Sequence, residues 1–275
     1  MEKHEQITDA EFEQLTGYMK QNYGIYIKPE KKYLVVGRLQ SYLLQHGFDD
    51  FSAFYKYLMT DKTGEASIEI VNRLTTNHTF FMREVDHFEY FKSIVLPYLT
   101  TRYGDSKDLR VWSAGCSSGE EPYTLAMLIA DHLGHQRPQW DAKILATDIS
   151  TRVIKTATRG IYSNEQTVNL PPQWLKSYFK SVGSSSGEIV ESVRNEVLFR
   201  PFNLMTPTFP FKKRFHVIFC RNVMIYFDNP TKYALVQRFY DVLEPGGYFF
   251  IGHSETLNRE DTPFQYIKPA IYRKV

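Results

Sequence analysis

The sequence predicts an α/β protein in which a doubly wound sheet follows an all-helical N-terminal domain. Residues 111–122 support this prediction, because they read as a short apolar strand, a loop bounded by Gly115 and Gly119, and the start of an amphipathic helix. After Asp108, strand and helix patterns alternate, as is typical of open sheets with mainly parallel strands. Before Asp108, apolar residues recur at helical spacing only.

The helical domain is expected to span residues 1–95, with a polar linker that extends to about residue 108. Its first helix opens with the capping box Thr8-Asp-Ala-Glu11, and Pro29 stands where it would open a second helix. Further helical patterns cover residues 51–59, 65–76 and 84–100, the last disturbed by Pro97.

The α/β domain is expected to span residues 109–275. Apolar runs bounded by turn residues predict its later strands at residues 143–147, 197–201, 215–220 and 248–252, with a terminal hairpin over residues 264–274. A helix is predicted from Pro230 to Leu243, and the serine- and glycine-rich residues 181–187 are typical of a hairpin tip or flexible loop.

Acidic residues open the helix that follows the glycine-bounded loop. Glu120 and Glu121 stand where a phosphate-binding loop would present bare N–H groups. An acidic entrance repels pyrophosphate and favours a cationic ligand, such as S-adenosylmethionine with its ammonium and sulfonium groups. The same acids are also typical of an ordinary helix N-terminus, where they complement the helix dipole.

Another acidic residue, Asp148, stands at the tip of the next strand. A carboxylate at that position can accept hydrogen bonds from both ribose hydroxyls of an adenosine. Alternatively, Asp148 belongs to the N-cap region of the following helix. Residues after two later strands are expected to border the same ligand cleft, namely Asn203, Leu204, Arg221, Asn222 and Tyr226.

The composition narrows the class of protein. The 275 residues include 33 basic and 31 acidic side chains, and the resulting net charge of +2 does not favour a nucleic-acid-binding protein. Two cysteines are too few for a disulfide scaffold, and the N-terminus lacks the apolar core of a secretory signal. The apolar runs are too short to span a membrane. We therefore expect a cytoplasmic protein with no direct membrane insertion.

Four strings that follow one another along the chain carry a family resemblance. They cover residues 74–84, 112–123, 146–149 and 220–227. With the helical N-terminal domain, they resemble the chemotaxis receptor glutamate methyltransferases, the CheR family, over nearly the whole chain. The resemblance implies a class I methyltransferase sheet, S-adenosylmethionine as cofactor with S-adenosylhomocysteine as product, and a small antiparallel β subdomain inserted at about residues 161–195.

The resemblance also implies roles for individual residues. Glu120 would bind the cofactor's ammonium and Asp148 its ribose. The remaining cofactor-binding positions would be Asn77, Thr79, Arg83, Asn203, Leu204, Arg221 and Asn222. Each has an ordinary alternative: Asn77 and Thr79 would cap the next helix, Asn203 and Leu204 would form a plain loop, and Arg221 would form a surface ion pair.

Methylation of a glutamate side chain needs no general base, because a carboxylate with a pKa near 4.3 is already ionised at neutral pH. The enzyme must align the nucleophile with the methyl group and remove water. We assign Arg83 to orienting the substrate carboxylate through its planar donor fork and Tyr226 to holding the substrate or the methyl donor. His78 and His253 have no partners at ligand spacing, so no metal site is expected.

The expected partners are methyl-accepting chemotaxis receptors, whose modified segment is acidic and helical in this family, and the chain is expected to act as a monomer. Lys28, Lys31, Lys32 and Arg38 fall within an arc of about 120° on the second predicted helix and form a candidate docking face. Val35 and Leu39 interleave with them, so a solvated helix face is an equal alternative.

Two other classes of function fit the same fold. One is a methyltransferase acting on RNA or a small molecule, which the near-neutral charge disfavours for RNA. The other is a catalytically silent protein that docks on receptors, which would have lost cofactor-binding positions.

Overall fold

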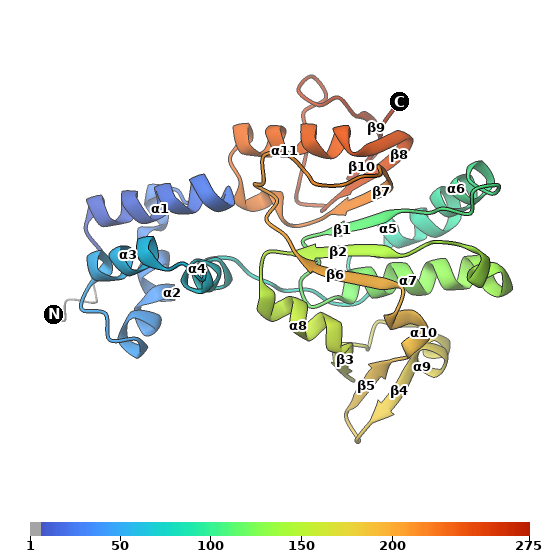
Figure 1. The fold of residues 1–275 in the computed structure, drawn as a ribbon, viewed down its shortest axis with the longest axis horizontal. Coiled ribbons are helices and arrows are strands. Elements are labelled where there is room, and N and C mark those ends of the chain that lie inside the picture. Colours follow the sequence, from blue (N-terminus) through green and yellow to red (C-terminus); the bar gives the residue numbers. More distant parts are fainter. Residues whose placement is uncertain (1–6) are drawn as a thin grey trace. The chain divides into compact units, whose positions relative to one another are not determined.

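The computed structural model of the protein describes residues 7–275 and divides the chain into two compact units (Figure 1). The first contains the N-terminal residues through Asn77 together with Tyr226–Lys232, and the second contains His78–Ile225 and Tyr233–Val275. The units thus divide earlier than the boundary expected near residues 95–108. The reason is that Phe88, Phe91 and Leu96 belong to the core of the second unit.

Four α-helices form most of the first unit: α1 (Asp9–Tyr23), α2 (Lys32–Gln45), α3 (Phe51–Thr60) and α4 (Glu65–Leu74). The predicted capping box is confirmed, because Glu11 N donates to Thr8 Oγ1 at 3.2 Å while Thr8 N donates to Glu11 Oε2 at 2.8 Å. Pro29 opens a 3₁₀ turn (Pro29–Lys31), and α2 begins only after it. Lys28 and Lys31 therefore lie outside α2.

The segment Tyr226–Lys232 completes the first unit. Tyr26 N donates to Tyr226 O at 2.8 Å, Ile25 pairs with Phe227 in a short antiparallel bridge, and Lys20 Nζ lies 2.7 Å from Asp228 Oδ2. The helical unit is therefore not continuous in sequence.

The helices of the second unit are interrupted where the sequence predicts a disturbance. A π-helical turn (Phe91–Val95) separates α5 (Val85–Tyr90) from α6 (Leu96–Arg102), and Pro97 stands in the first turn of α6. The later helices are α7 (Glu120–Leu133), α8 (Thr151–Arg159), α9 (Pro172–Tyr178), α10 (Glu191–Arg194) and α11 (Asn229–Asp241). Within residues 7–275, none of the helices has the length and apolar character needed to cross a membrane.

A seven-stranded sheet with the order β6-β2-β1-β7-β8-β10-β9 forms the centre of the second unit. Its strands are β1 (Val111–Ala114), β2 (Ile144–Asp148), β6 (Val197–Pro201), β7 (Phe215–Cys220), β8 (Leu243–Ile251), β9 (Gln265–Lys268) and β10 (Ile271–Arg273). Pairings from β6 to β8 are parallel, and β10 pairs antiparallel with both β8 and β9. The carboxyl ends of five strands therefore lie at one edge.

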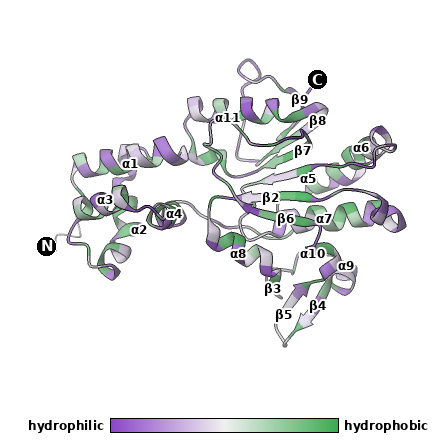
Figure 2. Ribbon diagram, viewed as in Figure 1, coloured by the Kyte–Doolittle hydropathy of each residue, from purple (hydrophilic) through white to green (hydrophobic). Residues whose placement is uncertain are grey.

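Side chains that alternate along the strands bury both faces of the sheet. On one face Phe219 packs against Phe88 and Phe91, with ring centroids 6.3 Å and 5.6 Å away. On the other face Trp112 packs against Phe239 of α11, with centroids 5.2 Å apart. The central strands and α7 are accordingly rich in hydrophobic residues (Figure 2). The predicted doubly wound sheet is confirmed.

A second, three-stranded sheet comprises β3 (Ile161–Ser163), β4 (Phe179–Val182) and β5 (Ser186–Ile189). All its pairings are antiparallel, in the order β3-β5-β4, and the turn between β4 and β5 falls within the serine- and glycine-rich residues 181–187. The predicted antiparallel insertion is confirmed.

Candidate functional site

At two positions of the loop from β1 to α7, the backbone conformation permits only glycine. Gly115 has φ +86°, and a Cβ there would lie 2.4 Å from Val223 Cγ2. Gly119 has φ +98°, and its Cβ would lie 2.8 Å from both Ala157 Cβ and Tyr162 Oη. Larger residues would therefore clash as well as strain the backbone. The loop forms a close-packed turn at the carboxyl end of β1.

Two carboxylates at the start of α7 have different surroundings. Glu120 is fully buried, and its carboxylate accepts from Ser118 Oγ at 2.7 Å and from Gln166 Nε2 at 3.4 Å. No Lys, Arg or His within residues 7–275 forms a salt bridge with it, and burial raises its pKa. Glu121 instead accepts from Ser113 Oγ at 2.6 Å and from Arg221 Nη1 at 2.9 Å. Glu120 is thus the acid that lacks a cation.

Asp148 is the last residue of β2, and its carboxylate binds the loop between β1 and α7. Its Oδ2 accepts from Ser117 N and its Oδ1 from Ser150 N, both at 2.9 Å. Ser150, and not Asp148, is the N-cap of α8, because Ser150 Oγ accepts from Val153 N. Burial raises the pKa of Asp148 and the backbone donors oppose that rise.

Asn203 and Leu204 follow β6 beside Asp148. Phe202 N donates to Asp148 O at 2.9 Å, which fixes the start of this segment next to the tip of β2. Asn203 Oδ1 accepts from Met205 N at 2.9 Å and its carbonyl accepts from Thr206 N at 3.0 Å, so Asn203 organises a local turn. Both residues are half-buried.

Arg221, directly after β7, forms a buried ion-pair network. Its Nη1 donates to Glu121 and its Nη2 to Glu84 Oε2 at 3.0 Å, while the guanidinium lies over the Phe88 ring at 5.2 Å. Its side chain is 3% exposed, so the alternative of a surface ion pair is wrong. A buried arginine between two carboxylates is costly to break, at about 3–5 kcal/mol.

Asn222 adopts a left-handed conformation, φ 59°, which is held from two sides. Its Nδ2 donates to Glu84 Oε1 at 3.2 Å, and its backbone N donates to Glu255 Oε2 at 3.0 Å. The buried Glu255 also accepts from Gly252 N at 2.6 Å and from Ile225 N at 3.2 Å. Sequence reasoning missed Glu255, although the polar string Gly252–Glu255 directly follows the end of β8.

The remaining predicted residues lie in two different units. Arg83 and Thr79 belong to the second unit, where Arg83 Nη1 donates to His78 O at 2.6 Å. Tyr226 and Asn77 belong to the first, where Thr76 N donates to Tyr226 Oη at 2.9 Å and Asn77 Nδ2 lies 3.5 Å from Asn72 Oδ1.

Neither Asn77 nor Thr79 caps a helix. The next helix, α5, has Glu84 at its N-cap position with no side-chain cap hydrogen bond. The capping alternative for these two residues is therefore wrong.

His253 has close neighbours that sequence spacing concealed. One ligand atom each from Glu84, His87 and His253 lies within 4.8 Å of the others. The expectation that His253 has no ligand partners is therefore wrong. It fails because the partners come from α5 and its N-cap, more than 160 residues earlier in the chain.

The described residues fit a cationic adenosine cofactor. Glu120 offers a buried carboxylate without a cation, Asp148 offers a second carboxylate at the tip of the adjacent strand, and the glycine positions keep the loop backbone close-packed. Glu120 therefore suits an ammonium group and Asp148 suits vicinal hydroxyls.

Comparisons with known proteins show which family the chain resembles. Residues 77–272 match the family model described as CheR methyltransferase, SAM binding domain, and residues 10–75 match CheR methyltransferase, all-alpha domain. A chemotaxis protein methyltransferase of Borreliella burgdorferi is 40% identical over 98% of this chain and 95% of its own. One of Escherichia coli is 36% identical, with 97% and 91% covered.

Solved structures give a much weaker likeness. The glycopeptide N-methyltransferase MtfA complexed with S-adenosyl-L-methionine is 17% identical over 57% of this chain and 52% of its own, with a TM-score of 0.32. A likeness of this degree supports no conclusion.

Proposed function

Because the chain belongs to the CheR methyltransferase family, we propose that it transfers the methyl group of S-adenosylmethionine to glutamate side chains of chemotaxis receptors, giving glutamate methyl esters. Relatives named chemotaxis protein methyltransferase align with almost the whole chain, which supports the receptor as substrate. The observation that carries the proposal is the buried Glu120 at the start of α7, which has no salt bridge in the described part of the chain, together with Asp148 at the tip of β2, which accepts from Ser117 N of the preceding loop.

When bound, S-adenosylmethionine supplies an electrophilic methyl group on a sulfonium. Glu120 would hold its ammonium and Asp148 its ribose. The cofactor's remaining surroundings would come from Asn77, Thr79, Arg83, Asn203, Leu204, Arg221 and Asn222. Ion pairing holds Arg221 in place, and Glu84 with Glu255 fixes Asn222, so these two positions are preorganised.

Arg83 and Tyr226 would act on the acceptor glutamate. Arg83 presents a planar donor fork, and its anchoring to the His78 carbonyl through one nitrogen leaves other donors for a carboxylate. The Tyr226 hydroxyl accepts from Thr76 N at 2.9 Å and donates to Thr76 O at 3.4 Å, and it would exchange this long bond for one to the acceptor carboxylate. Both groups would orient the acceptor and would not need to remove a proton from it.

Mass spectrometry of a receptor cytoplasmic fragment after incubation with isotopically labelled cofactor tests the proposal. We expect label on glutamates as alkali-labile esters, and a loss of rate in Arg83→Ala that saturating cofactor does not restore. Arg152→Ala, which removes an exposed arginine of α8, is the matched control. Label on RNA or a small molecule, or cofactor binding without transfer, would contradict the proposal.

A further inference from the structure

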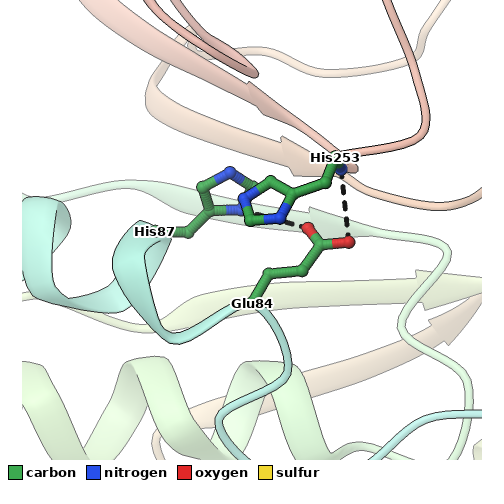
Figure 3. Close-up of side chains that lie close together, drawn as sticks. All are labelled: Glu84, His87 and His253. Carbon is green, nitrogen blue, oxygen red and sulfur yellow. Dashed lines mark hydrogen bonds and ion pairs between the residues drawn. The ribbon is translucent and has the colours of Figure 1, made fainter.

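Three side chains of the second unit meet outside the residues assigned to the cofactor (Figure 3). Glu84 precedes α5, His87 lies in its first turn, and His253 follows β8. The rings of His87 and His253 have centroids 4.6 Å apart and planes at 82°, and His87 Nδ1 lies 3.4 Å from Glu84 Oε2. Two imidazoles and a carboxylate therefore converge on a small volume.

His87 is the unexplained member of this cluster. Its side chain is fully buried, yet neither ring nitrogen has a hydrogen-bond partner. Buried polar atoms without a partner are rare in folded proteins, and such atoms often contact a bound ion or an ordered water molecule. A neutral imidazole has one ring nitrogen with a free lone pair, which can bind a metal ion.

The separation between His87 and Glu84 suits two ligands of one metal ion, and all three ligand atoms lie within 4.8 Å of one another. Bonds of about 2.0–2.1 Å in a tetrahedral site place neighbouring ligand atoms about 3.3–3.4 Å apart. The 3.4 Å between His87 Nδ1 and Glu84 Oε2 has this length and is too long for a good hydrogen bond. The His253 side chain is 45% exposed, so it provides an entry path and room for a water molecule as a fourth ligand.

Surrounding charges also favour a cation. Asp86 Oδ1 lies 3.1 Å from His253 Nε2, and a carboxylate behind a ligating histidine fixes the orientation of its ring. Arg221 opposes a metal, because its Nη2 lies 3.0 Å from the same Glu84 oxygen. That oxygen has a second lone pair, however, and two carboxylates, those of Glu84 and Glu121, pair with the single guanidinium.

We propose that Glu84, His87 and His253 bind one divalent transition-metal ion, with Zn²⁺ the best match to two imidazoles and one carboxylate. The role is structural. Glu84 also accepts from Asn222 Nδ2 and from His253 N through its other oxygen, so the ion would lock Glu84 against the segments after β7 and β8. The proposal does not depend on which substrate is methylated.

Metal titration of the full-length protein tests the proposal. Protein freed of metal with a chelator is titrated with Zn²⁺ by calorimetry and with Co²⁺ by visible absorption, and metal content is measured after gel filtration. We expect one equivalent per chain, and Co²⁺ bands of the intensity typical of four- or five-coordinate sites. Absence of stoichiometric binding, or only the weak spectrum of hydrated Co²⁺, would overturn the proposal.

Variants identify the ligands. His253→Ala removes a half-exposed side chain and should weaken Zn²⁺ binding at least tenfold, and Asp86→Asn should weaken it roughly 10–100-fold, as expected for a residue behind a ligand. His135→Ala, at an exposed position of the 3₁₀ turn after α7, is the matched control. Equal affinity in His253→Ala and His135→Ala would show that any metal binds elsewhere and would refute this site.

Discussion

Burial raises the pKa of Glu120, whereas a bound cation would lower it. The side chain is fully buried and meets only hydroxyl and amide donors, so its ionised form is disfavoured in the absence of a cation and its pKa is raised. A bound ammonium would favour the ionised form, so the ligand proposed for Glu120 would offset the cost of burying its charge. Asp148 differs, because two backbone N–H groups already stabilise its charge.

Neutralising either acid should weaken cofactor binding. We expect Glu120→Gln and Asp148→Asn each to raise the Kd for S-adenosylmethionine about tenfold or more, because a hydrogen bond to a charged group contributes about 1.5–3 kcal/mol. Isothermal calorimetry measures the change. Glu191→Gln, at an exposed position of α10, is the control. Parent-like affinity in both variants would refute the assignments to ammonium and ribose.

Glu255 is expected to position the segment that carries Asn222. Its two oxygens accept from three backbone N–H groups, and the Glu255→Gln side chain offers only one accepting oxygen. At least one buried donor would then lose its partner, at a cost of about 1–3 kcal/mol. We expect faster amide hydrogen exchange at residues 222–225 together with a lower methyl-transfer rate.

The exposed Glu260→Gln is the matched control for Glu255→Gln and should change neither quantity. A lower rate with unchanged exchange at residues 222–225 would point to a direct role of Glu255 in the reaction and would contradict a positioning role.

At the scale of elements, local signals predicted most boundaries correctly. The capping box at Thr8 and the disturbance at Pro97 each act within one helical turn, so a single sequence reveals them. The sequence predicts that the second helix begins at Pro29, but α2 begins at Lys32. Pro29 suits the first turn of a 3₁₀ helix as well as that of an α-helix, so the proline alone does not distinguish them.

The candidate docking face is smaller than the sequence predicts and lies before α2. Lys32 pairs with Asp9 at 2.7 Å, and Arg38 Nη1 donates to the Leu74 carbonyl at 2.7 Å, so Lys32 is neutralised and Arg38 is held against the end of α4. Val35 and Leu39 are fully buried. Only Lys28 and Lys31, both exposed, remain as candidates for receptor docking.

Reversal of Lys28 and Lys31 to Glu should lower kcat/KM for the receptor several-fold at low salt, because an acidic partner would no longer be steered toward them. The loss should shrink as salt rises and the Debye length falls to about 8 Å. Cofactor affinity should not change. Reversal of Lys56 and Lys62, two lysines of the same unit, gives the same net charge. Equal losses in both double variants would indicate net charge and not a docking face.

At the scale of the whole molecule, two buried histidines should make stability depend on pH. Burial, reinforced by Arg110, lowers the pKa of His216 to about 4, and the pKa of His87 is also about 4. The unfolded chain binds these protons near pH 6.5, so the stabilising contribution is complete above pH 6.5 and is lost as the pH falls toward 4. The slope is at most about 1.4 kcal/mol per pH unit for each histidine.

His216→Asn should flatten this dependence, because asparagine can accept the Arg110 N–H as His216 Nδ1 does at 2.9 Å but cannot ionise. Urea unfolding at pH 7 and pH 5 measures the difference. Tryptophan fluorescence reports on the second unit alone, since Trp112, Trp140 and Trp174 all lie there. Parallel pH profiles for the parent and His216→Asn would contradict the prediction.

The candidate site divides into a part that sequence predicts and a part that it does not. Asp148 ends a strand, and Glu120 and Asn222 follow strands, so the rule that ligands bind at strand carboxyl ends identifies all three as candidates. The contacts of Glu84 with Arg221 and of His253 N with Glu84 join residues 137 and 169 positions apart. Only the folded sheet brings such residues together, so no local pattern reveals them.

The discontinuity of the helical unit also bears on the order of events during synthesis. Its last native contacts come from Tyr226–Lys232, which leave the ribosome about 150 residues after Asn77. At about 5–20 residues per second, this segment is synthesised roughly 8–30 s after α1–α4. During that time Lys20 lacks its ion-pair partner Asp228, and Ile25 lacks its bridge partner Phe227. The late segment also carries Tyr226, so the nascent helical unit reaches its native contacts only when the tyrosine proposed for methyl transfer arrives.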